Sequence, residues 1–411
     1  MSHDNLINNI NLSKNIKDEV LDMSSSLKIF LKKFLGRENV EEIINNNFSD
    51  KELQLISDKF FCNYECKDNI LSKDVLIDLE IFEGLGIKKE DNIYRFIDKC
   101  QTYMGKYLLK KILSNPIKDT SKLLHRQDFI KKIYNDEELY KHILLKLDNI
   151  KSKESQLLWL WKALNEETQY LFNMVYFQNR FLKFLNRNEL VMKLYNYYVI
   201  IFSPIYGIIS PIMMVLAPFI LLKFYFKTDI NLTSYLKIIK ITFSGFSNIL
   251  GADLTKQDNP TFSMTNIISI LIWVIFYIHA LINNINNAIN TNKIINIMHK
   301  KLNDISSILD NGKDIYELLG NDLNDNSFYM NCEFKEHFTV LKSNTFKEEP
   351  NFYSNKGLIL KTYNILLEKK DNLIDNIRYI SNIDCFNSIV TLLKSSENVN
   401  YCFSEFNQNS K

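Results

Sequence analysis

Helix-breaking residues are scarce in this chain. Its 411 residues include 10 glycines and 6 prolines, which is few for the many tight turns of an all-β or α/β protein made of short elements. Hydrophobic residues make up 46% and charged residues 24%, so the chain can bury sizeable cores and is not disordered by composition. We therefore expect an all-α fold of long helices joined by loops rich in Asn and Ser.

An excess of charge of one sign is also lacking. The formal net charge is +2, which excludes a broad basic field, so any DNA contact would need a local patch. The cysteines do not form a zinc pattern, because Cys62 and Cys66 have no second pair or His-rich tract beside them. We expect no metal, and reduced thiols in a protein that faces the cytosol. The cysteines are Cys62, Cys66, Cys100, Cys332, Cys385 and Cys402.

Sequence motifs for catalysis are missing as well. No G-x-x-x-x-G-K-[ST] loop occurs, so the chain has no backbone cradle for nucleotide phosphates. The histidines are dispersed and form no acid–base group with the carboxylates. We expect no catalytic residue, no cofactor and no enzymatic activity. The polar start, MSHDNLINNINLSKN, lacks the apolar stretch of a cleavable signal peptide.

Two long uncharged runs occupy the middle of the chain. The first extends over 26 residues from Tyr197 to Leu222, more than the roughly 20 needed to cross a bilayer core. The second extends over 259–292, with its apolar part from Ile267 to Ile282, and is the weaker candidate. Prolines at 204, 211 and 218 imply kinks in a membrane helix or a re-entrant hairpin.

The alternative interpretation is a pair of buried helices in a soluble protein. Because 26 uncharged residues are rare in such helices, we predict a two-span transmembrane hairpin. Lysines follow the first run and flank the outer ends of both, so the positive-inside rule does not settle the orientation. His279 lies within the second run, and we interpret it as a helix end near the membrane interface.

The pattern of apolar residues divides the chain into four predicted regions. These are a helical segment at 1–70, a helical domain at 71–196, the apolar hairpin at 197–290 and returning helices at 291–411. We expect a helix capped by Asp50, short strands near His337–Leu341, and one long helix from Gly357 whose apolar seam is interrupted by Lys370. The aromatic residues of 165–194 follow a helical period, which favours a packing face over a surface for stacking bases.

Four short elements resemble, in order, the opening of the MutS core domain. Gly105 in such an element permits close helix approach, and Asp119 can cap a helix after Pro116. The sequence departs from the family at Tyr107, where MutS proteins have an arginine, which puts that arginine's ion pair in doubt. The elements are Leu79-Glu80-Ile81-Phe82, Thr102-Tyr-Met104-Gly105-Lys-Tyr-Leu108-Leu109, Leu113-Ser-Asn-Pro116-Ile-Lys-Asp119 and Arg126-Gln127-Asp128.

A second resemblance lies near the C-terminus. Ile383-Asp384-Cys-Phe-Asn-Ser388 and Asn400-Tyr401-Cys402-Phe403 are similar to the I-D-x-x-x-S helix and the N-Y-x-x-P entry into the family's ATPase domain. Ser404 stands where the family has proline. The resemblance implies an elongated multi-helical core and lever body, which stops at Lys411 on the threshold of an ATPase domain.

The resemblance also implies binding of mismatched DNA and ATP-dependent repair, although motifs for both are absent. The family's F-x-E wedge does not occur in 1–70, and Phe403-Ser-Glu405 has these letters at the wrong end of the chain. The apolar hairpin occupies the place of the family's DNA clamp, so we expect an intracellular, multi-pass membrane protein with its soluble parts facing the cytosol.

The expected partners are the lipid bilayer and a MutS-type ATPase subunit or a second copy of this chain, with DNA only as a family implication. The leading hypothesis is a scaffold or lever for an ATPase that is supplied elsewhere or lost. One alternative is a membrane-organising interaction protein with no role in repair. Another is a small transporter or channel, which two spans without an inward charge network argue against.

Overall fold

The structure is a computed structural model that describes most of the chain and divides it into two compact units. Unit 1 is built around Glu167–Ile295, and unit 2 is built from Ile44–Glu166 and Asn296–Lys411. The four predicted regions use other boundaries and remain predictions. The described residues are 40, 44, 47–62, 71–85, 91–228, 230–235, 237, 264–319, 350, 356–395 and 401–405.

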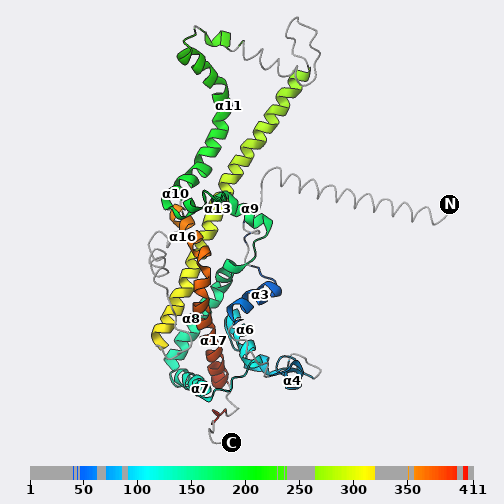
Figure 1. The fold of residues 1–411 in the computed structure, drawn as a ribbon, viewed down its shortest axis with the longest axis vertical. Coiled ribbons are helices and arrows are strands. Elements are labelled where there is room, and N and C mark those ends of the chain that lie inside the picture. Colours follow the sequence, from blue (N-terminus) through cyan, green and yellow to red (C-terminus); the bar gives the residue numbers. More distant parts are fainter. Residues whose placement is uncertain are drawn as a thin grey trace, which may run out of the picture. The chain divides into compact units, whose positions relative to one another are not determined.

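The described residues contain helices and turns but no strand, which confirms the all-α prediction (Figure 1). The strands expected near His337–Leu341 lie outside the described residues, as does most of the N-terminal helical segment at 1–70.

Unit 2 begins with a series of capped helices. Ser49 caps α3 through a reciprocal capping box with Glu52, so the cap predicted at Asp50 is wrong by one residue, because the Ser49 hydroxyl reaches the Glu52 amide. Asp119 caps α7 as expected, with its Oδ1 3.0 Å from the Ser121 nitrogen. The elements are α3 (Asp50–Phe60), α4 (Lys73–Asp78), α5 (Ile93–Ile97), α6 (Tyr103–Ser114), α7 (Thr120–Asn135), α8 (Glu137–Leu158) and the 3-10 turn η2 (Trp159–Trp161).

The return of the chain into unit 2 uses α13 (Met264–Leu319), α16 (Lys356–Glu368) and α17 (Ile374–Ser395). Residues of α13 up to Ile295 belong to unit 1 and those from Asn296 to unit 2. The single long helix expected from Gly357 is instead two helices, separated by the 3-10 turn η6 (Lys370–Leu373). At this break the Lys370 ammonium bonds the Leu160 carbonyl at 2.8 Å, and Asp371 pairs with Lys59 at 2.8 Å.

Helix α17 lies at the centre of unit 2. It packs against α6, α7 and α8, and more briefly against α3 and α5. Almost every residue from Asn376 to Ser388 is buried, which requires neighbours on all sides of the helix. Polar side chains on this helix therefore need partners inside the protein, and two of them bond the segment that leads into α6.

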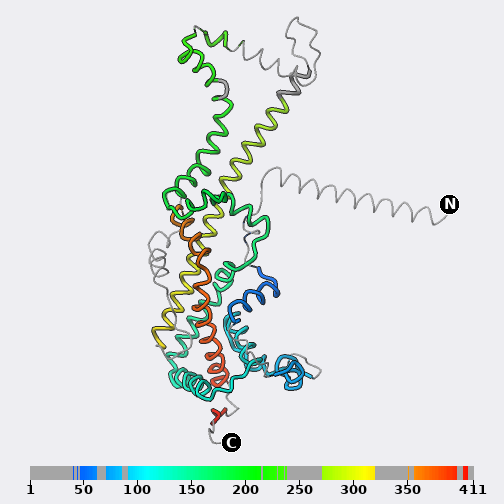
Figure 2. The backbone as a smooth tube through the Cα atoms, viewed as in Figure 1, coloured from blue at the N-terminus to red at the C-terminus, as the bar shows by residue number. Residues whose placement is uncertain are grey.

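Unit 1 contains α9 (Glu166–Val175), the 3-10 turn η3 (Lys183–Arg187), α10 (Glu189–Tyr197), α11 (Ser203–Ile220) and the first part of α13. Single π-helical turns at Tyr198–Phe202 and Leu221–Tyr225 flank α11, so the backbone is helical from Glu189 to Tyr225 (Figure 2). The uncharged run thus lies on a single helical path.

The aromatic residues of 165–194 do not share one helical face, so that interpretation is wrong. The helix ends after Val175, and a loop precedes α10. Phe172 and Tyr176 are buried, with rings stacked 6.3 Å apart. Phe181 and Phe184, in contrast, are exposed on the loop. Only the first part of the segment is a packing face.

Candidate functional site

The start of α6 is bound by a buried carboxylate from α17. Asp384 accepts hydrogen bonds from the Gln101 nitrogen at 2.9 Å, the Thr102 nitrogen at 2.7 Å and the Thr102 hydroxyl at 2.7 Å. The same hydroxyl caps the helix by accepting the Gly105 N–H at 3.0 Å. A helix N-terminus has unpaired amides and a positive dipole, both of which favour a carboxylate.

Gly105 allows the carboxylate to come this close. A Cβ placed on Gly105 would lie 2.8 Å from the Asp384 Cγ and 2.9 Å from its Cβ, with the carboxylate oxygen Oδ2 nearer still. The neighbouring Cys385 thiol donates to the Gly105 carbonyl at 3.1 Å. The close helix approach predicted for Gly105 is therefore present, and its partner is the predicted Asp384.

Ser388 fixes the segment just before this junction. Its hydroxyl accepts the Lys99 N–H at 2.7 Å and donates to the Ile97 carbonyl at 3.0 Å. Residues four apart lie on the same face of a helix, so Asp384 and Ser388 hold successive parts of one segment. This explains the physical use of the I-D-x-x-x-S spacing.

A second buried carboxylate, which sequence reasoning missed, binds the next two amides. Glu154 of α8 accepts from the Tyr103 nitrogen at 2.7 Å and from the Met104 nitrogen at 2.9 Å. Burial raises the pKa of Glu154 to about 7, Asp384 adds to the increase, and the two amides oppose it. Burial also raises the pKa of Asp384. The local sequence Lys-Ser-Lys-Glu-Ser-Gln has no spacing that distinguishes this glutamate from a solvated one.

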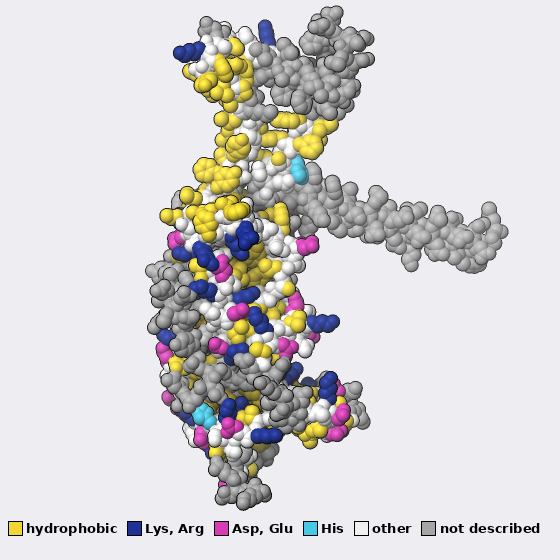
Figure 3. Space-filling view, viewed as in Figure 1, with side chains coloured by type: hydrophobic (Ala, Val, Ile, Leu, Met, Phe, Trp, Pro, Cys, Tyr) yellow, Lys and Arg dark blue, Asp and Glu magenta, His cyan; other side chains and the backbone are white. Residues whose placement is uncertain are grey.

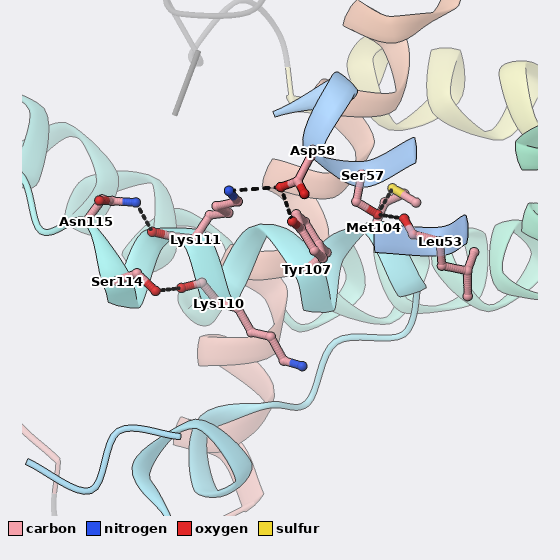
Figure 4. A network of polar contacts seen from close by, with 9 residues as sticks. All are labelled: Leu53, Ser57, Asp58, Met104, Tyr107, Lys110, Lys111, Ser114 and Asn115. Carbon is pink, nitrogen blue, oxygen red and sulfur yellow. Dashed lines mark hydrogen bonds and ion pairs between the residues drawn. The ribbon is translucent and has the colours of Figure 1, made fainter. Parts of the chain in front are cut away.

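Tyr107 takes part in a small polar network between α3 and α6 (Figure 4). Its hydroxyl donates to Asp58, which also pairs with Lys111 at 3.1 Å. Burial alone would raise the pKa of Asp58, but the bonds from Tyr107 and Lys111 outweigh it and lower that pKa. Lys111, one turn after the missing arginine, therefore supplies a positive charge on this face of α6.

Hydrophobic contacts complete the α6 junction. Leu108 is fully buried, and Met104, 2% exposed, receives the Ser57 hydroxyl at its sulfur (Figure 4). The structure thus brings together Thr102, Met104, Gly105, Leu108, Asp384 and Ser388.

The other residues of the family resemblance lie outside this junction. Leu79 is exposed at the end of α4, and Glu80 follows it with a left-handed φ of 50°. Pro116 follows the end of α6, whose final residue is Ser114. Arg126 is half-buried in α7. Tyr401 is exposed in the C-terminal described segment.

The C-terminal segment lies against α7. The Gln127 amide donates to the Ser404 carbonyl at 2.9 Å, and the Lys131 ammonium lies 5.0 Å from the centre of the Phe403 ring. The predicted motif at Tyr401 is therefore next to the predicted motif at Arg126, although the bonded residues Gln127 and Ser404 are 277 positions apart in the sequence.

Unit 1 carries the second candidate feature, the apolar hairpin. Two helices, Glu189–Met213 and Leu271–Leu319, are long and apolar enough to cross a membrane. Only 11% and 6% of their most apolar 18-residue stretches are buried. A buried core helix would be covered instead. Large apolar side chains dominate the described surface of α11 and the first part of α13 (Figure 3). Tyr197, Leu222 and Ile282 are half-buried, and the side chain of Ile267 lies outside the described residues.

The two arms of the hairpin meet at Gly207. A Cβ at this glycine would lie 3.0 Å from the Asn284 amide nitrogen and 3.6 Å from Leu281. The Tyr277 hydroxyl is 3.1 Å from the Gly207 carbonyl and 3.2 Å from the Ile208 carbonyl. Pro211, four residues after Gly207, has no N–H to bond that carbonyl. Tyr277 and the Ser210 hydroxyl, also at 3.1 Å, supply donors instead.

These arrangements hold helices together and offer no open reaction centre. Asp384 and Glu154 are buried within the α6 junction. Within the part of the chain that the structure describes, no group of three or more His, Cys, Asp or Glu side chains is placed to hold a metal ion.

Comparison with known proteins connects one part of the chain to a family. Residues 74–165 match the family profile described as MutS domain III. The DNA mismatch repair protein MutS of Thermosipho melanesiensis is 34% identical over 77 residues, which is 18% of this chain and 9% of that protein. No solved structure matches. The matched region extends from α4 through α8 and includes the start of α6 and Glu154, so the similarity to MutS covers this part of the chain.

Proposed function

We propose that this chain is a membrane-tethered MutS-like module, in which a helical body related to MutS domain III carries a two-span hairpin that lies in the bilayer. The observation that carries the proposal is the exposure of the hairpin. The most apolar parts of its two helices are almost uncovered, whereas the helices of unit 2 are packed around α17.

The lengths of the helices fit a membrane. The helical path from Tyr197 to Leu222 is about 37 Å long, and the uncharged part of α13 from Met264 to Asn292 is about 42 Å, at the usual rise of an α-helix. A hydrocarbon core is about 30 Å thick. In lipid a carbonyl freed by proline needs a donor from a neighbouring helix, and the Tyr277 hydroxyl meets this need at Gly207.

Two spans return the chain to the side on which it entered, so the parts before and after the hairpin share one side of the membrane. We place them in the cytosol. There, a MutS-type ATPase on another chain would act on the helical body, or two copies of this chain would associate. The C-terminal segment against α7 supports this role, because it joins the two parts of the chain that resemble MutS.

Alkaline carbonate extraction of membranes from expressing cells tests the tether. We expect the protein to remain in the membrane pellet. The variant Ile208→Arg/Ile212→Arg places charges on exposed apolar positions of α11 and should move protein into the soluble fraction. Leu55→Arg, at an exposed leucine on α3, is the matched control and should stay in the pellet. Release of the unaltered protein would overturn the tether.

A role in repair is tested by binding of purified protein to matched and mismatched duplexes at near-physiological salt. Tighter binding of the mismatched duplex would support such a role. Equal binding would favour the second candidate, a membrane-organising interaction protein without a repair function. The sequence has no P-loop and no F-x-E wedge in residues 1–70, and this observation keeps the second candidate open.

A further inference from the structure

The loop between α9 and α10, residues 177–187, presents aromatic and basic side chains together. Phe181 is 83% exposed and Phe184 is 68% exposed. Arg180, Lys183 and Arg187 on the same loop are also exposed. The loop sequence, Phe-Gln-Asn-Arg-Phe-Leu-Lys-Phe-Leu-Asn-Arg, contains no acidic residue.

The loop has a defined conformation. Asn186 is 2% exposed, its Nδ2 donates to the Phe177 carbonyl at 3.0 Å, and its Oδ1 accepts the Phe177 N–H at 3.0 Å. The Asn179 carbonyl accepts from the Leu182 nitrogen at 2.8 Å and from the Lys183 nitrogen at 2.9 Å. A buried amide that satisfies both backbone groups closes the loop, which keeps Phe181 and Phe184 on its outer surface.

The loop packs against α10, which leads into the hairpin. The Phe177 ring lies 4.6 Å from the Tyr195 ring of α10, and the Tyr195 hydroxyl donates to the Met174 carbonyl at 3.3 Å. Helix α10 then leads directly into the uncharged run that begins at Tyr197. When the uncharged run crosses a bilayer, the headgroup region of that bilayer therefore lies near this loop.

Aromatic side chains with neighbouring Lys and Arg are typical of the membrane–water interface. Rings enter the headgroup region, and the cations pair with anionic lipids. We infer that the 177–187 loop is a second membrane contact, which inserts Phe181 and Phe184 at the interface and binds anionic phospholipid headgroups. This inference rests on the proposed membrane tether.

Photo-crosslinking of the full chain, reconstituted in vesicles of equal parts phosphatidylcholine and phosphatidylglycerol, tests the inference. p-Benzoylphenylalanine replaces Phe181 in one variant, Ile208 of the hairpin in a second and Leu55 of α3 in a third. Mass spectrometry then identifies the adducts. We expect lipid adducts at positions 181 and 208 and almost none at 55, with phosphatidylglycerol enriched about fivefold at 181. Adding Arg180→Gln/Lys183→Gln/Arg187→Gln should return that ratio to the vesicle composition.

The outcomes separate the two proposals. Lipid adducts at 208 without lipid adducts at 181, or with protein adducts there, would overturn the loop contact and leave the tether standing. Lipid adducts at neither position would overturn both. Adducts at 181 that match the vesicle composition would overturn the binding of anionic headgroups. Circular dichroism of each variant checks that the helical fold is kept.

Discussion

Two buried carboxylates and one glycine define the start of α6. Asp384 and Glu154 together accept four successive backbone amides, from Gln101 to Met104. Desolvation penalises both charges, whereas hydrogen bonds and the helix dipole favour them. The junction therefore depends on close geometry, and small changes there should have large effects.

The first prediction concerns Gly105→Ala. The added methyl group collides with the Asp384 carboxylate, and that carboxylate cannot move without lengthening three hydrogen bonds. We expect a loss of about 2–4 kcal/mol in the free energy of unfolding. Denaturation of the detergent-solubilised protein measures it. Lys106→Ala, at the exposed neighbouring position, is the control, and an equally small effect of both variants would contradict the close packing.

The second prediction concerns pH. The pKa of Glu154 is about 7 in the folded protein, above an ordinary value of 4.5. Between these two pH values the folded state binds more protons than the unfolded state, so stability falls as pH rises and levels off above pH 7. A shift of this size corresponds to roughly 3 kcal/mol.

Melting temperatures measured from pH 4.5 to 8 test this dependence. Glu154→Gln stays neutral and should remove most of the slope, while Asp148→Asn, at an exposed position of the same helix, should keep it. A slope that survives Glu154→Gln would assign the effect to other groups.

At the scale of elements, the two helices of the hairpin approach each other at Gly207, and Pro211 follows one turn later in α11. Pro211 removes one hydrogen bond from α11, and Tyr277 of α13 supplies a replacement from outside the helix. The tyrosine ring is also stacked on Trp273 at 5.9 Å, which holds the hydroxyl in place. The turn of α11 that contains Pro211 is thereby bonded to α13.

The third prediction is a coupling between these two residues. Tyr277→Phe should cost about 0.5–1.5 kcal/mol, the usual range for a bond between helices in lipid. In a Pro211→Ala background the alanine N–H can bond the Gly207 carbonyl, so the same change should cost less. Unfolding at increasing concentrations of dodecyl sulfate measures the free energy of unfolding for each variant of this double-mutant cycle. Tyr206→Phe is the control at an exposed tyrosine. Equal costs in both backgrounds would mean that Tyr277 does not serve the freed carbonyl.

At the scale of the whole molecule, the helical body and the apolar hairpin differ in how far their apolar residues are exposed. Unit 2 encloses its apolar residues around α17, whereas the described hairpin leaves them exposed. These 411 residues contain no P-loop and cannot bind nucleotide phosphates through that motif. Under the proposed function, work from ATP would be done by an ATPase outside these residues.

The fourth prediction follows from this division. The purified chain should release no phosphate from ATP above a no-protein control, because it has no P-loop. ATP turnover by the chain alone that withstands further purification would show that a nucleotide site was overlooked. The fifth prediction is that the protein stays in the membrane pellet on carbonate extraction. This result tests the hairpin independently of nucleotide.

Several structural features could be predicted from local sequence. The scarcity of glycine and proline gave the all-helical class, and Asp119 after Pro116 gave the start of α7. The resemblance to MutS motifs identified Thr102, Gly105, Asp384 and Ser388, which the structure brings together at one junction. Two features were missed. The cap of α3 is Ser49, one residue before the predicted Asp50. The helix breaks at Lys370, whose ammonium bonds the Leu160 carbonyl in another element.

The sequence by itself determined the helical class, the uncharged runs and the MutS-like motifs, because these depend on residue type and spacing along one chain. Only the tertiary structure decided that Glu154 joins Asp384 at α6, that Asp58 of α3 binds both Tyr107 and Lys111, and that Tyr277 bonds the carbonyl freed by Pro211. Each of these contacts joins residues on different helices or different turns, and their partners are chosen by packing in three dimensions. Local periodicity carries no information about that choice.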